Sequence, residues 1–140
     1  MVYFLVQIRH SVVMKTLTIF LALTFSVLFS SSSYAGWTKA GENVNGNTYY
    51  VDFERIRKVD GYVYYWRLSD YLKPLQSSIF SAKIYIQGDC KYFRFKGLSY
   101  SFHTEPMGGG SGVAEEPDKE WTYPSPNSVD EITLKSVCNR

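Results

Sequence analysis

The sequence predicts an α+β fold, in which an antiparallel β-sheet meander carries a C-terminal helix tied to one sheet face by a disulfide. Three observations lead to this class. Residues 48–103 consist mostly of runs rich in aromatic and β-branched residues, which favour strands. The tight-turn dipeptides Asn45-Gly46 and Asp60-Gly61 lie on either side of the first of these runs. A helix-start signal, Ser128-Val129-Asp130-Glu131, lies near the C-terminus.

The first half of the domain predicts two short strands, one helical turn and a long strand. A strand begins at Trp37 and is followed, after the Asn45-Gly46 turn, by a strand over residues 48–53. Asp52 is placed to cap a single helical turn over residues 54–57. Residues 62–71 then form a long strand. Its even positions are expected to give the buried apolar face: Tyr62, Tyr64, Trp66 and Leu68.

The second half predicts two further strands and the helix. Residues 73–78 indicate a loop, and residues 79–90 a strand with Ile84, Ile86 and Cys90 on one face. In the strand over residues 91–103, the hydrophobic phase changes at Gly97, which predicts a β-bulge. The bulge is expected to keep the aromatic residues on both sides of it inward, among them Phe93, Phe95, Tyr100 and Phe102.

The rest of the chain predicts a loop, an edge segment and the helix. Residues 105–121 contain the glycine cluster Gly108–Gly112 and an acidic stretch, and they are expected to form a flexible loop. Residues 121–124 are expected to pair briefly at a sheet edge. The helix runs from Val129 to about Val137, where Cys138 follows.

The amino terminus has the three parts of a secretory signal peptide. Met14-Lys15 gives a positive start, residues 17–29 an apolar core, and Ser33-Tyr34-Ala35 a small-residue end. The core is shorter than the roughly 20 residues needed to span a bilayer. We therefore expect residues 1–35 to be a signal peptide cleaved after Ala35. Met14 is the expected start, and a long n-region that includes residues 1–13 is the alternative.

Cleavage leaves one mature domain, residues 36–140, in the periplasm or outside the cell. The two cysteines of such a chain, Cys90 and Cys138, predict one disulfide. A pair of metal-binding thiolates is the competing hypothesis, but it needs further ligands, and His103 is the one histidine left after cleavage. No metal and no cofactor is expected.

The charge balance excludes one class of partner. The chain has 15 Lys and Arg against 13 Asp and Glu. Arg9 and Lys15 belong to the signal peptide, so the mature domain is neutral. A neutral domain gives no electrostatic reason to expect nucleic acid as a partner.

Catalytic motifs are sparse. Ser101 or Ser111 could form a triad with His103 and an aspartate, but no Gly-x-Ser-x-Gly setting surrounds Ser111. The Gly108–Gly112 cluster lacks the Gly-Lys-Ser/Thr ending of a phosphate loop. We therefore expect no enzymatic activity, and a small periplasmic hydrolase that uses His103 is the weaker alternative.

Aromatic residues make up 17% of the chain, and they occupy both faces of the predicted strands. Tyrosine is favoured at recognition surfaces. Cross-strand aromatic pairing explains the same residues without any ligand. The candidate binding surface consists of the tyrosines expected to point outward: Tyr50 (or its neighbour Tyr49), Tyr65, Tyr85 and Tyr92.

Several short motifs occur in a fixed order along the mature domain. They are Trp37-Thr38-Lys39, Thr48-Tyr49-Tyr50-Val51-Asp52, Ile56-Arg57-Lys58, Tyr64-Tyr65-Trp66-Arg67-Leu68, Ser81-Ala82-Lys83, Asp89-Cys90, the Gly108–Gly112 loop and Val137-Cys138. With these motifs the chain resembles the surface-adhesin protein E family over nearly all of residues 36–138. The resemblance implies an antiparallel sheet with a C-terminal helix held by a disulfide. For the family's namesake it also implies attachment to host matrix proteins.

One position departs from the family pattern. The namesake adhesin is anchored through a lipid-carrying cysteine directly after its signal, whereas Gly36 occupies that position here. We therefore expect no lipid anchor, and no transmembrane helix after cleavage. Two functions remain open. The first is an exported, non-enzymatic protein-binding module that contacts host matrix proteins, and the second is a soluble periplasmic component with an envelope protein as its partner.

Overall fold

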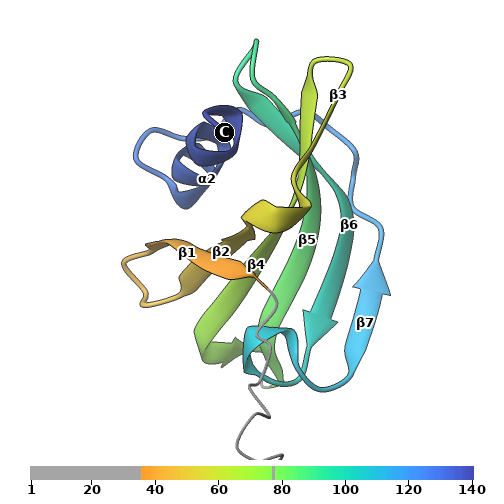
Figure 1. Cartoon of the computed structure of the whole chain (residues 1–140). Helices are drawn as coiled ribbons and strands as arrows, with labels where there is room; N and C mark the ends of the chain where they lie inside the picture. Colours follow the sequence, from red (N-terminus) through yellow and green to blue (C-terminus); the bar gives the residue numbers. More distant parts are fainter. Residues whose placement is uncertain (1–35, 77) are drawn as a thin grey trace, which may run out of the picture. The chain divides into compact units, whose positions relative to one another are not determined.

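The computed structural model describes residues 36–76 and 78–140, so the expected signal peptide lies outside the described residues. They form a seven-stranded antiparallel sheet with a C-terminal helix, α2 (Val129–Cys138), packed across one face (Figure 1). The predicted fold class is confirmed. The strand order is β1-β2-β4-β5-β6-β7, and β3 pairs with β4 beside this path.

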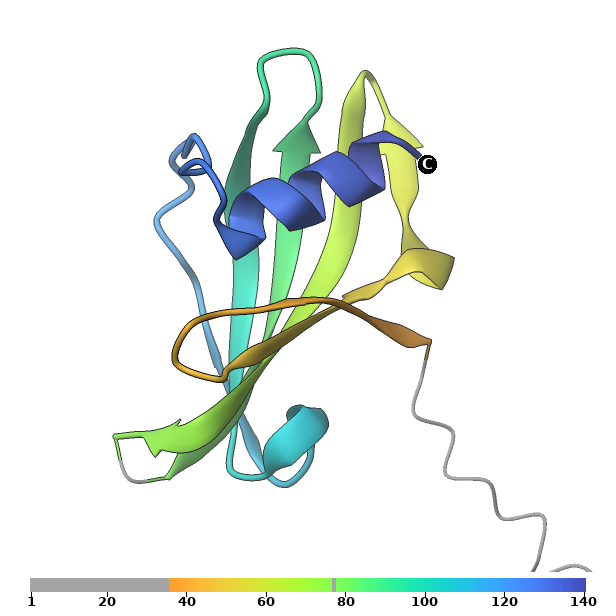
Figure 2. The ribbon, with the colours of Figure 1, turned by 90° about the vertical axis from the view of Figure 1, so that its left-hand side faces the viewer.

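The elements follow one another as a meander. The strands are β1 (Trp37–Glu42), β2 (Thr48–Asp52), β3 (Arg57–Val59), β4 (Tyr62–Leu75), β5 (Ile79–Asp89), β6 (Arg94–His103) and β7 (Gly112–Glu115). Two short 3₁₀ helices are η1 (Phe53–Arg55) and η2 (Pro106–Gly108). Figure 2 shows the β1–β2 hairpin crossing between α2 and η2, which therefore lie on different sides of it.

The predicted turns and caps are present. Gly46 and Gly61 have φ angles of 78° and 82°, in the left-handed region that glycine adopts at little cost. The Asp52 carboxylate accepts hydrogen bonds from the backbone N–H groups of Glu54 and Arg55, both at 3.2 Å, and so caps η1.

Two strand boundaries differ from the prediction. β4 extends to Leu75, which pairs with Ile79, so the expected loop over residues 73–78 shrinks to the tip of a hairpin. β6 begins at Arg94 rather than Lys91, because a turn that includes Phe93 at a φ of 50° precedes it. The β-bulge at Gly97 is confirmed. Tyr85 pairs with Ser99 and Ile86 with Gly97, which leaves Leu98 as the extra residue.

The hydrophobic core lies between α2 and one face of the sheet. Its buried members are Val51, Val63, Tyr65, Ile84 and Ile86 from the sheet, and Leu134 and Val137 from the helix. Gly88 makes this contact possible. A Cβ atom there would lie 2.8 Å from both Leu134 Cδ1 and Val63 Cγ1, closer than carbon atoms can pack.

This packing corrects the predicted faces of the long strand. The odd positions Val63 and Tyr65 are each 1% exposed beneath α2. Successive side chains on a strand alternate between faces, so Tyr62, Tyr64 and Trp66 point to the opposite side. Leu68, the fourth even position, is fully buried, as predicted. The prediction was wrong because residues 62–66 are bulky at both parities, and their apolar pattern does not mark the face that a helix will cover.

The segment expected to be a flexible loop contains two ordered elements, η2 and β7. The Met107 N–H donates to Asp70 Oδ1 at 2.7 Å, and the Gly108 N–H donates to Ser81 Oγ at 2.8 Å. These side chains from β4 and β5 fix η2 on the sheet. β7 then pairs with β6 from Gly112 onward. The brief edge pairing predicted near residues 121–124 is confirmed by a bridge between Phe95 and Thr122.

The disulfide between Cys90 and Cys138 is confirmed, with the two Cα atoms 5.7 Å apart. It joins the turn after β5 to the last residue of α2. At the other end of the helix, Ser128 Oγ accepts the Glu131 N–H at 3.2 Å, as the capping motif predicts. Among the described residues, no helix has the length and apolar character needed to cross a membrane.

Candidate functional site

Six large aromatic side chains gather on the sheet face opposite α2, and we call them the aromatic face. Tyr85 on β5 lies opposite Trp66 in the strand register, so the two share this face. Trp37 lines a cavity together with Trp66. All six are half-buried rather than covered. The members of the aromatic face are Trp37, Tyr62, Tyr64, Trp66, Tyr85 and Trp121.

The rings of the aromatic face contact one another across the strands. The ring centroids of Trp66 and Tyr85 are 4.9 Å apart, and those of Tyr64 and Tyr85 are 6.3 Å apart. Tyr62 stacks on Trp121 with centroids at 5.8 Å. Such pairs hold each other in place. The rings therefore form a fixed row across the sheet while keeping part of their surface in solvent.

Cationic side chains accompany this row. The guanidinium of Arg94 lies 4.5 Å from the Trp121 ring centroid, and the ammonium of Lys96 lies 4.7 Å from it, both within cation–π range. Arg57 on β3 pairs with Tyr64 in register and so belongs to the same face. A cavity of about 170 Å³ at the other end of the row is lined by Trp37, Arg55, Trp66 and Lys83.

The two most buried carboxylates of this face are already neutralised. Asp52 forms an ion pair with Arg55, and Asp89 forms one with Arg94 at 3.0 Å. Burial acts to raise the pKa of Asp89, but hydrogen bonds from the Tyr92 N–H and from Arg94 outweigh it and hold the pKa below its usual value. Within the described residues, no carboxylate lies within ion-pair distance of Arg57, Lys83 or Lys96. The face therefore carries excess positive charge.

The structure distributes the four predicted tyrosines unequally. Tyr85 lies at the centre of the aromatic face, and Tyr50 pairs with Leu68 on the same side of the sheet. Tyr92 is 57% exposed in the turn before β6, with its ring centroid 5.0 Å from the Arg94 guanidinium. Tyr65 is buried under α2, so its expected outward position is wrong. Burial also raises the pKa of Tyr65 to about 12.

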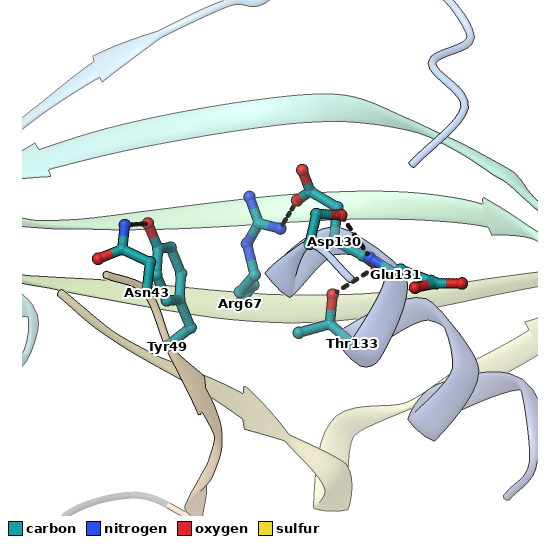
Figure 3. A network of polar contacts seen from close by, with 7 residues as sticks. Asn43, Tyr49, Arg67, Asp130, Glu131 and Thr133 are labelled. Atoms are coloured by element: carbon teal, nitrogen blue, oxygen red, sulfur yellow. Dashed lines mark hydrogen bonds and ion pairs between the residues drawn. The ribbon is translucent and has the colours of Figure 1, made fainter. Parts of the chain in front are cut away.

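On the other side of the sheet, a polar network fixes the start of α2 (Figure 3). The Arg67 guanidinium pairs with Asp130 on the helix and lies 5.8 Å from the ring centroid of Tyr49. Asn43 Nδ2 donates to the Tyr49 hydroxyl at 3.1 Å, and the Thr133 hydroxyl donates to the Asp130 carbonyl at 3.1 Å. A cavity of about 420 Å³ opens beside this network. Its charges pair with one another or with Lys39, so we assign the network to helix docking.

Comparison with known proteins identifies the family of this chain. The family model described as Surface-adhesin protein E matches residues 37–139. The chain belongs to the surface-adhesin protein E family. A comparison with curated proteins found no match.

Solved structures of Haemophilus influenzae protein E share the fold. Crystal form II of that protein is 20% identical, with 75% of this chain and 88% of that chain covered at a TM-score of 0.63. The selenomethionine form is 19% identical, with 75% and 87% covered at a TM-score of 0.61. At this identity, the likeness shows that this member of the surface-adhesin protein E family has the fold of those structures.

The fold also brings together Ser101 and His103, the serine and histidine of the hydrolase alternative. Ser101 Oγ and His103 Nε2 are 3.0 Å apart. In the described part of the chain, however, the buried Nδ1 atom of His103 has no hydrogen-bond partner, whereas a triad needs a carboxylate there. Ser111 Oγ contacts Thr104 Oγ1 at 3.3 Å instead. Residues 36–76 and 78–140 hold no group of three potential metal ligands.

Proposed function

We propose that this protein is an exported, non-enzymatic binding module that holds a protein partner through its aromatic face. Membership of the surface-adhesin protein E family supports a role in adhesion. The observation that carries the proposal is the row of half-buried Trp and Tyr rings flanked by Arg and Lys. Tyr, Trp and Arg are the residue types that dominate binding energy at protein interfaces.

The composition of this face favours a partner over a purely structural role. An antiparallel sheet with one solvent-facing side ordinarily alternates apolar residues inward with polar residues outward. Here β4 has Val63 and Tyr65 inward, yet Tyr62, Tyr64 and Trp66 outward. A cluster of large, partly exposed aromatic side chains on a solvent-facing side is the usual mark of an interaction surface.

The expected partners are host matrix proteins, and the proposal includes cleavage after Ala35 to release residues 36–140. A second candidate is an envelope component that binds a protein of the periplasm. One observation favours it. Both cysteines of the sequence, Cys90 and Cys138, are joined in the disulfide, so neither thiol is free to carry a lipid for surface display.

Protease accessibility on intact cells separates the two candidates. The adhesin proposal expects cleavage on intact cells or recovery of the protein from the medium. Protection that ends only when the outer membrane is opened would favour the periplasmic candidate instead.

Binding of the purified exported protein to immobilised matrix proteins tests the surface itself. Tyr85→Ala removes the central ring of the aromatic face and is expected to weaken binding at least about tenfold, which corresponds to about 1.4 kcal/mol. Ile132→Ala truncates an apolar residue of α2 that is 44% exposed, and it serves as the control on the opposite side. Equal binding by both variants and the wild type would contradict the proposed surface.

A further inference from the structure

We infer that the aromatic face also binds an anionic polysaccharide, a chain of sugar rings that carries carboxylate or sulfate groups. The inference rests on the proposed use of this face as the binding surface, and it adds a second class of ligand to the protein partner. It follows from three features: the cations of this face that have no carboxylate partner, the cavity between two tryptophans, and a second aromatic–cationic position across the sheet.

The cations and carboxylates of the aromatic face are not equally paired. On the aromatic face, Asp52 and Asp89 are paired with arginines, and Asp70 accepts the Met107 N–H. Arg57, Lys83 and Lys96 are left without carboxylate partners among the described residues. The aromatic face therefore keeps cations without carboxylate partners, and these complement an anionic ligand.

The cavity of about 170 Å³ combines two chemical functions. Trp37 and Trp66 supply indole surfaces, on which the apolar C–H faces of a sugar ring can pack. Arg55 and Lys83 supply charge-assisted hydrogen-bond donors for an acidic substituent on that ring. One N–H of the Lys83 ammonium donates to the Gly108 carbonyl oxygen at 3.1 Å, which leaves two for the ligand. The Arg55 side chain is 60% exposed, so part of its guanidinium remains accessible although its Nε donates to Asp52.

A second position of the same composition lies near Trp121. Its ring has Arg94 and Lys96 over it at 4.5 and 4.7 Å, and Tyr62 stacks against it. Tyr85 and Tyr64 lie between the two positions along β5 and β4. An aromatic surface with adjacent cations at both ends of one row suits a polymer of repeated acidic rings better than a single small molecule.

An acidic polypeptide fits this face less well. The backbone groups of β4 and β5 pair with neighbouring strands, so a peptide lying over the middle of the sheet gains no main-chain hydrogen bonds, which strand addition at an edge would supply. Its own amides would lose water without replacement partners. A sugar ring avoids this cost, because its apolar faces can contact the rings while its hydroxyl groups stay in water at the rim.

The protein carries its own reporter for such a ligand. The chain has three tryptophans, Trp37, Trp66 and Trp121, and all three belong to the aromatic face. The experiment titrates the purified exported protein with heparin at low salt and follows tryptophan emission. Neutral dextran, poly-glutamate and a single-stranded oligonucleotide are titrated in parallel. We expect a saturable change with heparin that weakens as salt rises, none with dextran, and weaker binding of the other two polyanions.

A triple variant locates the binding. Arg57→Gln, Lys83→Gln and Lys96→Gln together remove three charges but retain every ring, and we expect heparin to bind at least about tenfold more weakly, or about 1.4 kcal/mol. The matched control removes three charges on the α2 side, with Lys58→Gln, Lys135→Gln and Arg140→Gln, and should change affinity less than about twofold. Melting temperatures of both variants verify folding.

Several results would overturn the inference. They are an absence of any emission change with heparin, an equal loss of affinity in the control triple variant, and tighter binding of poly-glutamate or the oligonucleotide. The last result would assign the face to an acidic protein or to nucleic acid. Failure here is distinguishable from failure of the proposed function. Capture by matrix proteins without a heparin response leaves the adhesin proposal standing, whereas a heparin response without capture removes the protein partner alone.

Discussion

Gly88 lies where β5 passes beneath α2, and its missing side chain lets the helix pack closely on this face of the sheet. Leu134 fills the space above it, in contact with Val63 on the neighbouring strand. The choice of this face for the core leaves Tyr62, Tyr64 and Trp66 on the other face. A single glycine thus links the packing of the helix to the composition of the proposed binding surface.

Substitution of Gly88 by alanine is expected to destabilise the protein by about 1–3 kcal/mol, because the new methyl group would overlap Leu134 and Val63. Gly41→Ala is the control, since the nearest atom to a Cβ there is Ile132 Cδ1 at 4.0 Å. Denaturant unfolding of both variants measures the difference. Equal stability of the two would show that α2 does not pack closely over Gly88.

His103 makes stability depend on pH in a defined direction. Burial, followed by the neighbouring Lys83 ammonium, lowers the pKa of His103 from its ordinary value of 6.5. The unfolded chain therefore binds the proton more tightly than the folded chain. The stabilising contribution of neutral His103 is complete above about pH 6.5 and is lost as the pH falls from there through the lowered pKa.

Thermal melts from about pH 7.5 to about pH 5.5 check this, with His103→Asn as the comparison. The wild type should lose more of its melting temperature over that range than the variant, because the variant has no group at this position to protonate. Parallel losses in the two proteins would contradict the lowered pKa.

At the scale of elements, α2 is attached to the sheet at both ends. The disulfide holds its C-terminal end to the turn after β5, and the Arg67–Asp130 pair holds its first turn to β4. Such a short helix would not be stable by itself in water. Its stability therefore comes from these two attachments and from the buried Leu134 and Val137 between them.

Loss of the disulfide should loosen this helix. Cys90→Ser or Cys138→Ser is expected to lower the free energy of unfolding by about 2–5 kcal/mol, because the unfolded chain regains the freedom of a closed loop whose ends are 48 residues apart. Hydrogen exchange should show faster exchange in α2 than in β5. A melting temperature equal to that of the wild type under oxidising conditions would show that the bridge contributes nothing.

The ion pair at the other end of the helix predicts a non-additive effect. Asp130→Ala leaves the Arg67 charge largely buried, with its side chain 11% exposed, and should cost roughly 2 kcal/mol, less than a fully buried pair because Asp130 is 38% exposed. The double variant Arg67→Met with Asp130→Ala removes both charges and should recover part of that loss. Additive losses in urea unfolding would show that the two residues are not coupled.

Local signals in the sequence predicted most elements, because each has a short-range physical cause. Asn45-Gly46 and Asp60-Gly61 specify turns, Ser128 caps a helix, and Gly97 marks the bulge. Local signals could not predict which face of β4 is buried under α2. The buried face depends on where α2 and Gly88 meet, and these are separated by some 40 residues in the sequence.

At the scale of the whole molecule, the aromatic face is assembled from distant segments. Trp37 comes from the first strand, Tyr85 from the middle of the sheet, and Trp121 from the connection between β7 and α2. The sequence predicted an outward aromatic surface that includes Tyr85, and the structure places Tyr85 on the face opposite α2, while its part in binding stays a prediction. It could not place Trp121, because that residue reaches Tyr62 only through the path of a connection with no regular pattern.

Partners are proposed to bind the aromatic face rather than the side covered by α2. Hydroxyl-radical footprinting of the protein, free and bound to a matrix protein, distinguishes the two sides. We expect reduced labelling of Trp66, Tyr85 and Trp121 in the complex, with Tyr49 on the α2 side unchanged. Protection of Tyr49 and of α2, with no change at the three aromatic-face residues, would contradict it.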